Sequence, residues 1–364
     1  MAQDEKFMSP KQQFLFIIQA QIGVGVLSIP YKLSETAKGG GGISVIMAGI
    51  ITQIIILMMW ALMRKFPGRN LFQICLQLAG PIVGRMLIIC YIGYFLFLGA
   101  NIMLSAIEVL SRWILQETPK WVLLGLFSIM TFYLAREKLT VLARFYSLAS
   151  GLFIPLIIFV SYGLTQAHIE YMFPIMETGF WNILRGTKDT TNSMYGFEVF
   201  LIIFPFIDAS DKQKLFIISM SNLFVTLFYT FVVCTCLMVF TSDQLRIIPE
   251  PVIYLVKSLN FYIFDRADII FLSIWSITLV CSIVSYCYSA SIGLSVLFKQ
   301  KNHRSFAPYV QIAIYFIALL PITPITIHHF DQMAEFAAYL FIATIPAVLM
   351  IVSLFVKRKA GRTV

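Results

Sequence analysis

The chain has 364 residues, of which 59% are hydrophobic and only 12% are charged, and its formal net charge is +9. Water-soluble domains are roughly half apolar and about a quarter charged, so this composition excludes a soluble globular protein. The apolar residues come in blocks of roughly 20, the length that an α-helix needs to cross a bilayer. They do not form the segments of about ten alternating residues that are typical of a β-barrel. We therefore expect an all-α integral membrane protein.

Ten apolar segments are long enough to be membrane-spanning helices. Polar or mixed residues precede the first segment and no small-residue cleavage pattern follows it, so we do not expect a cleaved signal peptide. In chain order the segments cover approximately residues 12–31, 42–63, 82–111, 120–135, 141–165, 192–208, 214–240, 267–298, 306–322 and 333–356.

The basic residues predict the orientation. If the N-terminus is cytoplasmic, 18 of the 27 lysines and arginines fall on the cytoplasmic side of these ten segments. The positive-inside rule then places both termini in the cytoplasm, which agrees with an even number of spans. Anionic lipid headgroups are the expected partners of this positive face, and the charge needs no nucleic acid to explain it.

Neither the cysteines nor the histidines indicate a cofactor. The six cysteines match no spacing of a zinc, haem or iron–sulfur site, and the four histidines fall in predicted loops. No nucleophile and base occur together in a signature context. We therefore expect no metal, no cofactor and no enzymatic activity.

The first segment contains the stretch IGVGVLSIPY, in which Gly23, Gly25 and Pro30 weaken a helix. An interruption is tolerated in a membrane only where the backbone faces protein, water or a ligand. The stretch therefore predicts an opening towards a cavity around Gly23, Val24, Gly25 and Val26. The alternative is that the two glycines only allow close helix packing.

The sixth segment carries a second interruption, because Gly196 is followed by Phe197, the acid Glu198 and later Pro205. Segments 1 and 6 occupy the same position in two five-helix halves, approximately 12–165 and 192–356. Broken helices at corresponding positions indicate an inverted-repeat transporter fold of the LeuT type, with a ligand site between the breaks. We expect a single permease-like domain over residues 1–364.

Polar residues line one face of two other segments. At about 100° per residue, the four polar residues of segment 3 lie within roughly 60° of each other and predict an inward face. The stripe in segment 8 is equally explained by hydroxyl groups that bond the preceding turn or join helices. The two stripes are Tyr94, Asn101, Ser105 and Glu108, and Thr278, Ser282, Ser285 and Ser289.

Glu108 and Glu198 are the only acids that we place within the membrane-spanning part of these segments. A carboxylate in hydrocarbon costs several kcal/mol unless it is paired, solvated or protonated. Glu108 is expected either to belong to a polar or proton relay, or to act as an anchor that reaches the interface or pairs with Arg112. Glu198 is expected to bind a ligand or a proton, the alternative being a protonated acid that bonds the freed backbone.

Several motifs resemble a known family. GVGVLSIP is similar to the first-helix motif of the amino acid, polyamine and organocation transporter superfamily, and Gly196, Phe197 and Glu198 resemble its sixth-helix motif. Four stretches, together with a basic tail, resemble the B subunit of endospore germinant receptors, in the spore germination permease family, along the whole chain. They are SPKQQFLFIIQAQIGVGVLSIPYKL, FPGRNLFQICLQLAGPIVGRML, FPIMETGFWNILRG and YGFEVFLIIFPFI.

The resemblance implies a germinant-sensing subunit in the inner membrane of a dormant spore, working with A and C subunits and recognising amino acids or similar nutrients. Free N–H groups at the positive end of a half-helix suit a carboxylate, and freed carbonyls with Glu198 suit an ammonium. The candidate ligand residues are Gly23, Val24, Gly25, Val26, Tyr94, Asn101, Tyr195, Gly196, Phe197, Glu198, Ser282 and Ser285.

A working secondary transporter is the rival hypothesis. Glu198 is a titratable group that is able to couple proton movement to amino acid transport, and a transporter needs the same cavity as a sensor. A scaffold without a ligand is disfavoured because it has no need of two helix breaks around a buried acid. Only the resemblance favours the sensor.

Overall fold

The computed structural model describes residues 7–258, 266–321 and 323–355. Within these ranges the chain is helical, apart from loops and one isolated parallel bridge between Met8 and Ile207. The predicted all-α class is therefore confirmed. Lys6 and the basic tail of residues 357–362, which contribute to the predicted orientation, lie outside the described residues, and the orientation in the membrane stays a prediction.

The helical elements make this a multi-pass membrane protein. The long, apolar elements of the described residues are Lys38–Met63, Leu71–Trp113, Leu139–Gln166, Asp211–Val239, Ala267–Leu297 and Ile325–Phe355. A further span is formed by α1 (Pro10–Gln21) and α2 (Gly25–Thr36), which meet at a bend of 53°. Shorter apolar helices cover Lys120–Ala135, Phe197–Phe206 and Ala307–Leu319. Each of the ten predicted segments overlaps one of these elements.

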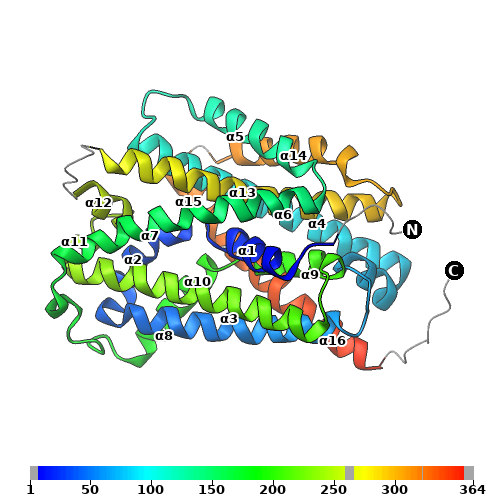
Figure 1. Cartoon of the computed structure of the whole chain (residues 1–364), viewed down its shortest axis with the longest axis horizontal. Coiled ribbons are helices and arrows are strands. Elements are labelled where there is room, and N and C mark those ends of the chain that lie inside the picture. Colours follow the sequence, from blue (N-terminus) through cyan, green and yellow to red (C-terminus); the bar gives the residue numbers. More distant parts are fainter. Residues whose placement is uncertain (1–6, 259–265, 322, 356–364) are drawn as a thin grey trace.

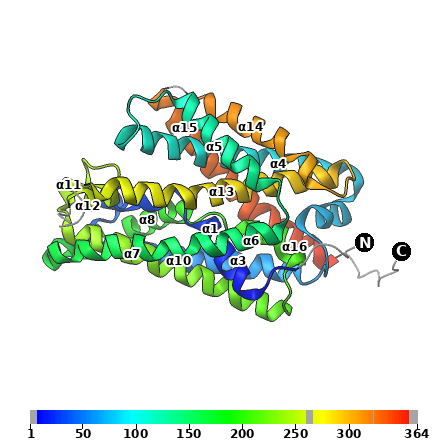
Figure 2. The same cartoon turned by 45° about the horizontal axis from the view of Figure 1, so that its top comes forward.

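The long helices run side by side around the bent pair. In Figures 1 and 2, α3 (Gly41–Met63) and α10 (Asp211–Val239) lie on one side of α1, and α5 (Lys120–Ala135) and α14 (Ala307–Leu319) lie on the other. Between them α13 (Ala267–Leu297) packs along α4 (Leu71–Trp113). The remaining α-helices are α6 (Leu139–Ala149), α7 (Phe153–Tyr162), α8 (Phe180–Ser193), α9 (Phe200–Ile203), α11 (Ser242–Leu245), α12 (Pro251–Ser258), α15 (Pro324–Ala338) and α16 (Ile345–Phe355).

Three boundaries differ from the prediction. Residues 71–80, which precede the third predicted span, form one element with it. This element, α4, is kinked at Gly80 (φ 77°) before Pro81. The sixth segment begins earlier than predicted, because α8 already starts at Phe180 and only its end overlaps residues 192–208. The last segment also begins earlier, with Thr323 capping α15 and Pro324 in its first turn.

We define two broken helices from these elements. Broken helix 1 is α1 with α2, and broken helix 6 is α8 followed by the short turns η5 (Phe197–Val199), α9 and η6 (Phe204–Phe206). The start of helix 1 is tied to the end of helix 6. The Met8 N–H donates to the Phe206 carbonyl at 2.9 Å, and the Asp208 N–H donates to the Met8 carbonyl at 2.9 Å. This bridge fixes how the two broken helices lie against each other at one end.

At the same end of the molecule, a buried histidine joins the loop between α13 and α14 to the loop between α5 and α6. His303 lies in the turn η7 (His303–Ser305), 3.1 Å from the Glu137 carbonyl, while Arg304 pairs with the Glu137 carboxylate at 3.3 Å. The His303 ring also packs edge-on against Tyr288. Burial lowers the pKa of His303 below its ordinary value of 6.5.

Because of His303, we expect the folded protein to lose stability in acid. As the pH falls below about 6.5, the unfolded chain takes up a proton at His303 that the folded chain does not bind until its own lower pKa is reached. The contribution of His303 to the stability is therefore fully present above pH 6.5. It is lost as the pH falls from 6.5 to the lower pKa of the folded state. Thermal unfolding of the purified protein between pH 7.5 and 5 should show a smaller decline for His303→Gln than for the wild type. Equal declines would contradict this role.

Candidate functional site

Helix 1 is interrupted where its glycines predicted. α1 ends at Gln21, Ile22 is extended (φ −79°, ψ 99°), and α2 begins at Gly25 without a side-chain cap. The last turn of α1 is met by Ser282 of α13, whose hydroxyl donates to the Gln19 carbonyl at 3.0 Å. The first N–H groups of a helix have no partner within the helix, so α2 presents an uncapped positive end at the break.

Helix 6 is interrupted beside helix 1. Its chain turns at Gly196, whose φ of 121° is favourable for glycine alone. The Gln21 side chain donates to the Met194 carbonyl at 3.1 Å and so joins the two breaks. The Tyr229 hydroxyl lies 3.3 Å from both the Gln21 and the Ser193 carbonyl oxygens. The two breaks therefore form one polar centre within the helix bundle.

The glycines at this centre have two different roles. A Cβ on Gly196 would lie 2.1 Å from the Ala20 carbonyl oxygen, and one on Gly25 would lie 2.4 Å from the Ser193 Cβ. These two glycines allow the broken helices to touch. A Cβ on Gly23 would meet no atom within 4 Å. Both alternatives for the first helix thus apply to different residues, with Gly25 at a packing contact and Gly23 beside open space.

Glu198 is held by three donors at the start of the second half of helix 6. Its Oε2 accepts from the Gly196 N–H at 2.7 Å, and its Oε1 accepts from the hydroxyls of Tyr286 at 2.8 Å and Tyr94 at 3.2 Å. Only 2% of the residue is exposed. This arrangement satisfies the backbone that the break frees, as the alternative for this acid expects. Its predicted binding of a ligand or proton stays a prediction.

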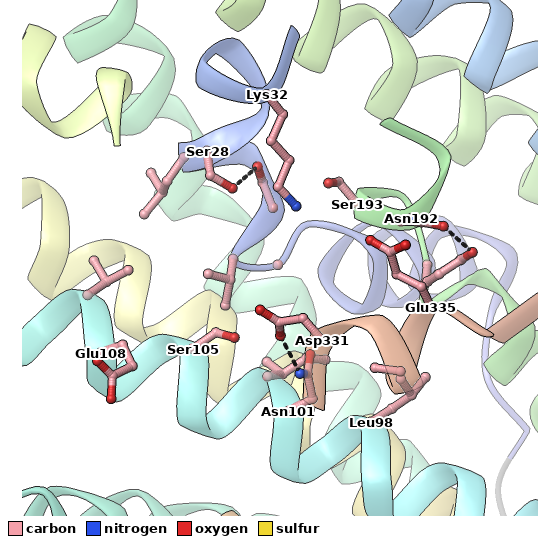
Figure 3. A pocket seen from close by; sticks show the side chains of 18 of the residues that line it. Ser28, Lys32, Leu98, Asn101, Ser105, Glu108, Asn192, Ser193, Asp331 and Glu335 are labelled. Atoms are coloured by element: carbon pink, nitrogen blue, oxygen red, sulfur yellow. Dashed lines mark hydrogen bonds between the residues drawn. The ribbon is translucent and has the colours of Figure 1, made fainter. Parts of the chain in front are cut away.

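A cavity of about 510 Å³ adjoins the breaks (Figure 3). It extends from the break of helix 1 and the end of α8 along α4 to α15 and the segment before α12. The predicted site residues that line it are Gly23, Val24, Gly25, Asn101, Tyr195 and Glu108. The walls combine helix ends, polar side chains and apolar residues, which is typical of a pocket for a small polar ligand.

The other predicted ligand residues lie behind the cavity wall, which does not include Val26, Tyr94, Gly196, Phe197, Glu198, Ser282 or Ser285. Tyr286 connects this group to the cavity, because it lines the cavity and also donates to Glu198. Ser285 lies 2.9 Å from the Tyr146 hydroxyl and donates to the Cys281 carbonyl. The stripe on α13 thus bonds the backbone and joins helices.

Two acids of the cavity were missed. Asp331 and Glu335 lie one turn apart on α15, in the apolar element Ile325–Phe355, so the expectation that only Glu108 and Glu198 lie inside spans was wrong. The Asn101 amide donates to Asp331 at 2.7 Å. The available signals were the acid spacing of four residues and the start signal at Thr323 and Pro324.

Ion pairs form at the end of the cavity that is remote from the breaks. Glu108 pairs with Lys120 and not with Arg112, which corrects the expected partner. Arg112 pairs instead with Glu250, whose other oxygen accepts from the Trp113 indole N–H at 3.3 Å. Glu250 directly precedes α12, and only 6% of it is exposed. These pairs attach α5 and α12 to the end of α4.

Comparisons with known proteins agree with this architecture. Residues 7–327 match the spore permease family, described as spore germination protein. Spore germination protein GerQB of Bacillus cereus is 26% identical over 289 residues, 79% of each chain. Spore germination protein B2 of Bacillus subtilis is 24% identical over 370 residues, which is 100% of this chain and 99% of the relative.

A solved structure shares the fold. MhsT in complex with L-phenylalanine aligns with a TM-score of 0.65 over 96% of this chain and 99% of its own, at 13% identity. This likeness concerns the fold alone and confirms the expected LeuT-type class. Relatives and structural neighbours are permease-like or transporter-like proteins, not enzymes.

Proposed function

The chain belongs to the spore permease family of spore germination proteins, and we propose that it senses a nutrient by binding an amino acid in the cavity beside the two helix breaks. One observation carries the proposal: the cavity is lined by Gly23, Ser193 and Tyr195, where both broken helices leave backbone groups without helical partners. The LeuT-type neighbour MhsT, solved with L-phenylalanine, supports an amino acid as the ligand class.

The helix ends at the cavity suit both charges of an amino acid. The uncapped N-terminus of α2 offers N–H groups and a positive dipole end to the carboxylate. Gln21 and Ser193, the last residues of α1 and α8, bring negative helix ends to the same space for the ammonium. In this arrangement Glu198 does not contact the ligand but supports the break of helix 6 from behind.

The response is transmitted by a shift between conformations. A ligand that binds one arrangement of the broken helices more tightly than another shifts the population towards it. Through Tyr286, Glu198 and Gly196, the cavity wall is linked by hydrogen bonds to the turn of helix 6. We infer that A and C subunits receive this shift, in the spore inner membrane, with both termini of this chain in the cytoplasm.

The test is binding and flux measured in one preparation. The purified protein in liposomes is given labelled amino acids, with and without a pH gradient. Binding with negligible flux supports a sensor, and gradient-driven accumulation supports the proton-coupled transporter. If no amino acid binds, the proposed function is wrong.

Gly23→Leu provides the matched structural test. The position has open space for a side chain, so the variant should insert and fold but weaken binding by at least about tenfold, because leucine occupies the cavity. Gly125→Leu is the control, since Gly125 lies in α5, outside the cavity wall, and also has no atom within 4 Å of an added Cβ. Wild-type affinity in Gly23→Leu would place the ligand elsewhere.

A further inference from the structure

The charges along the cavity do not balance. Apart from His328, its wall contains four acids and two basic residues, and the pairs of Glu108 with Lys120 and of Arg112 with Glu250 neutralise three of these six. Three charged residues are left, Lys32 on α2 and the acids Asp331 and Glu335 on α15. None of the three is in an ion pair with any other residue that the structure describes.

These three side chains face the same space. Figure 3 shows Lys32 approaching from one side of the cavity and Asp331 and Glu335 from others, without a direct contact between them. Asp331 accepts a hydrogen bond from Asn101, which is neutral and therefore leaves its charge uncompensated. All three residues are half-buried. Charges in such positions interact more strongly with a ligand than they would in bulk water.

An unpartnered acceptor lies on the same wall. Gln21 is 1% exposed and lines the cavity. Its amide nitrogen is bonded to Met194, but its Oε1 has no hydrogen-bond partner among the described residues. A buried polar atom without a partner is costly, and a ligand with a donor group would satisfy it. This observation indicates a ligand that brings a hydrogen-bond donor to this wall, independently of the acids.

From this charge pattern we propose that the preferred ligand is an amino acid with a cationic side chain, such as lysine, and that Asp331 and Glu335 recognise its side-chain cation. The proposal rests on the proposed function. The α-carboxylate and α-ammonium cancel at the helix ends, so the net charge of −1 from Lys32, Asp331 and Glu335 faces the ligand's side chain. A basic side chain complements it, whereas an acidic one would be repelled.

Calorimetry on the full chain in lipid nanodiscs tests this inference with three probes. L-norleucine has the side-chain carbons of L-lysine without the terminal amine, and cadaverine keeps both amines without the carboxylate. We expect lysine to bind at least about tenfold more tightly than norleucine, and cadaverine to bind more weakly than lysine. Norleucine binding as tightly as lysine overturns the inference.

Two variants assign the preference to α15. Asp331→Asn keeps an acceptor for Asn101 but removes the charge, and Glu335→Gln removes the second charge. In each variant the difference in affinity between lysine and norleucine should become smaller, and in the double variant the two affinities should agree within about threefold. Glu117→Gln, an exposed acid outside the cavity, is the control and should keep the full difference.

The outcomes separate this inference from the proposed function. A lysine preference that survives in the double variant shows that other groups recognise the cation, which overturns the role of α15. Binding of neutral amino acids without a lysine preference overturns only the ligand class and leaves the proposed function standing. Failure of every amino acid to bind removes both.

Discussion

Gly196→Ala is expected to destroy the folded protein. The added Cβ would lie 2.1 Å from the Ala20 carbonyl oxygen, and this backbone atom of α1 has no rotamer by which to move away. The φ of 121° adds strain of about 1–3 kcal/mol for a residue with a side chain. Together these effects should lower the stability by more than about 3 kcal/mol. The measurement is the yield of monodisperse protein after extraction, and its unfolding temperature.

Gly68→Ala separates the contact from the backbone strain. Gly68 also has a positive φ, 74°, but a Cβ there would meet no atom within 4 Å. Its variant should remain folded and lose only about 1–2 kcal/mol. Similar losses in both variants would show that the φ angle, and not the approach of the two broken helices, requires glycine at residue 196.

The two helix breaks could be predicted because residues at the breaks themselves cause them. Gly23 and Gly25 inside an apolar run, and Gly196 before Phe197, mark places where a spanning helix cannot continue without another partner for its backbone. The structure has both interruptions at these residues. Whether a glycine is a packing contact depends on the helix opposite it. Gly25 faces Ser193 and Gly196 faces Ala20, and in each pair the two residues are far apart in the sequence.

The first half of helix 6 escaped prediction for a physical reason. α8 has the polar sequence FWNILRGTKDTTNS, which hydropathy does not distinguish from a loop. It forms a helix because it packs against α3 and α2. Its threonine hydroxyls are satisfied within the helix by carbonyls one turn back, as Thr187 donates to Ile183 at 3.0 Å. A helix beside a polar cavity is not selected for apolar composition.

The candidate site was only partly predictable. Asn101 and Tyr195 line the cavity as expected, but Asp331 was placed in a loop because the apolar run begins after it. The direction in which the Glu198 side chain points could not be predicted from the sequence either. It follows a glycine with positive φ and lies in a single turn of tight helix, where helical periodicity does not apply.

Glu198→Leu should be among the most disruptive substitutions of the bundle. It would leave the Gly196 N–H and the hydroxyls of Tyr94 and Tyr286 without their acceptor. Each unsatisfied buried donor costs about 1–3 kcal/mol, so the total exceeds about 3 kcal/mol. Thermal unfolding in detergent measures it. Tyr94→Phe is the control, because it removes only the longest of the three bonds and leaves no donor unpaired.

Glu198→Gln distinguishes support of the break from binding of a ligand or proton. The amide can accept at one oxygen but presents N–H groups to the remaining donors, so we expect a loss of about 1–3 kcal/mol together with a weakened nutrient response. If stability and response fall together, the acid acts by holding the turn at Gly196. Wild-type stability with an abolished response would contradict that role, because the structural bonds would then be dispensable while the titratable group is not. The carboxyl group would in that case act directly on the ligand or on a proton, as the sequence alone had indicated.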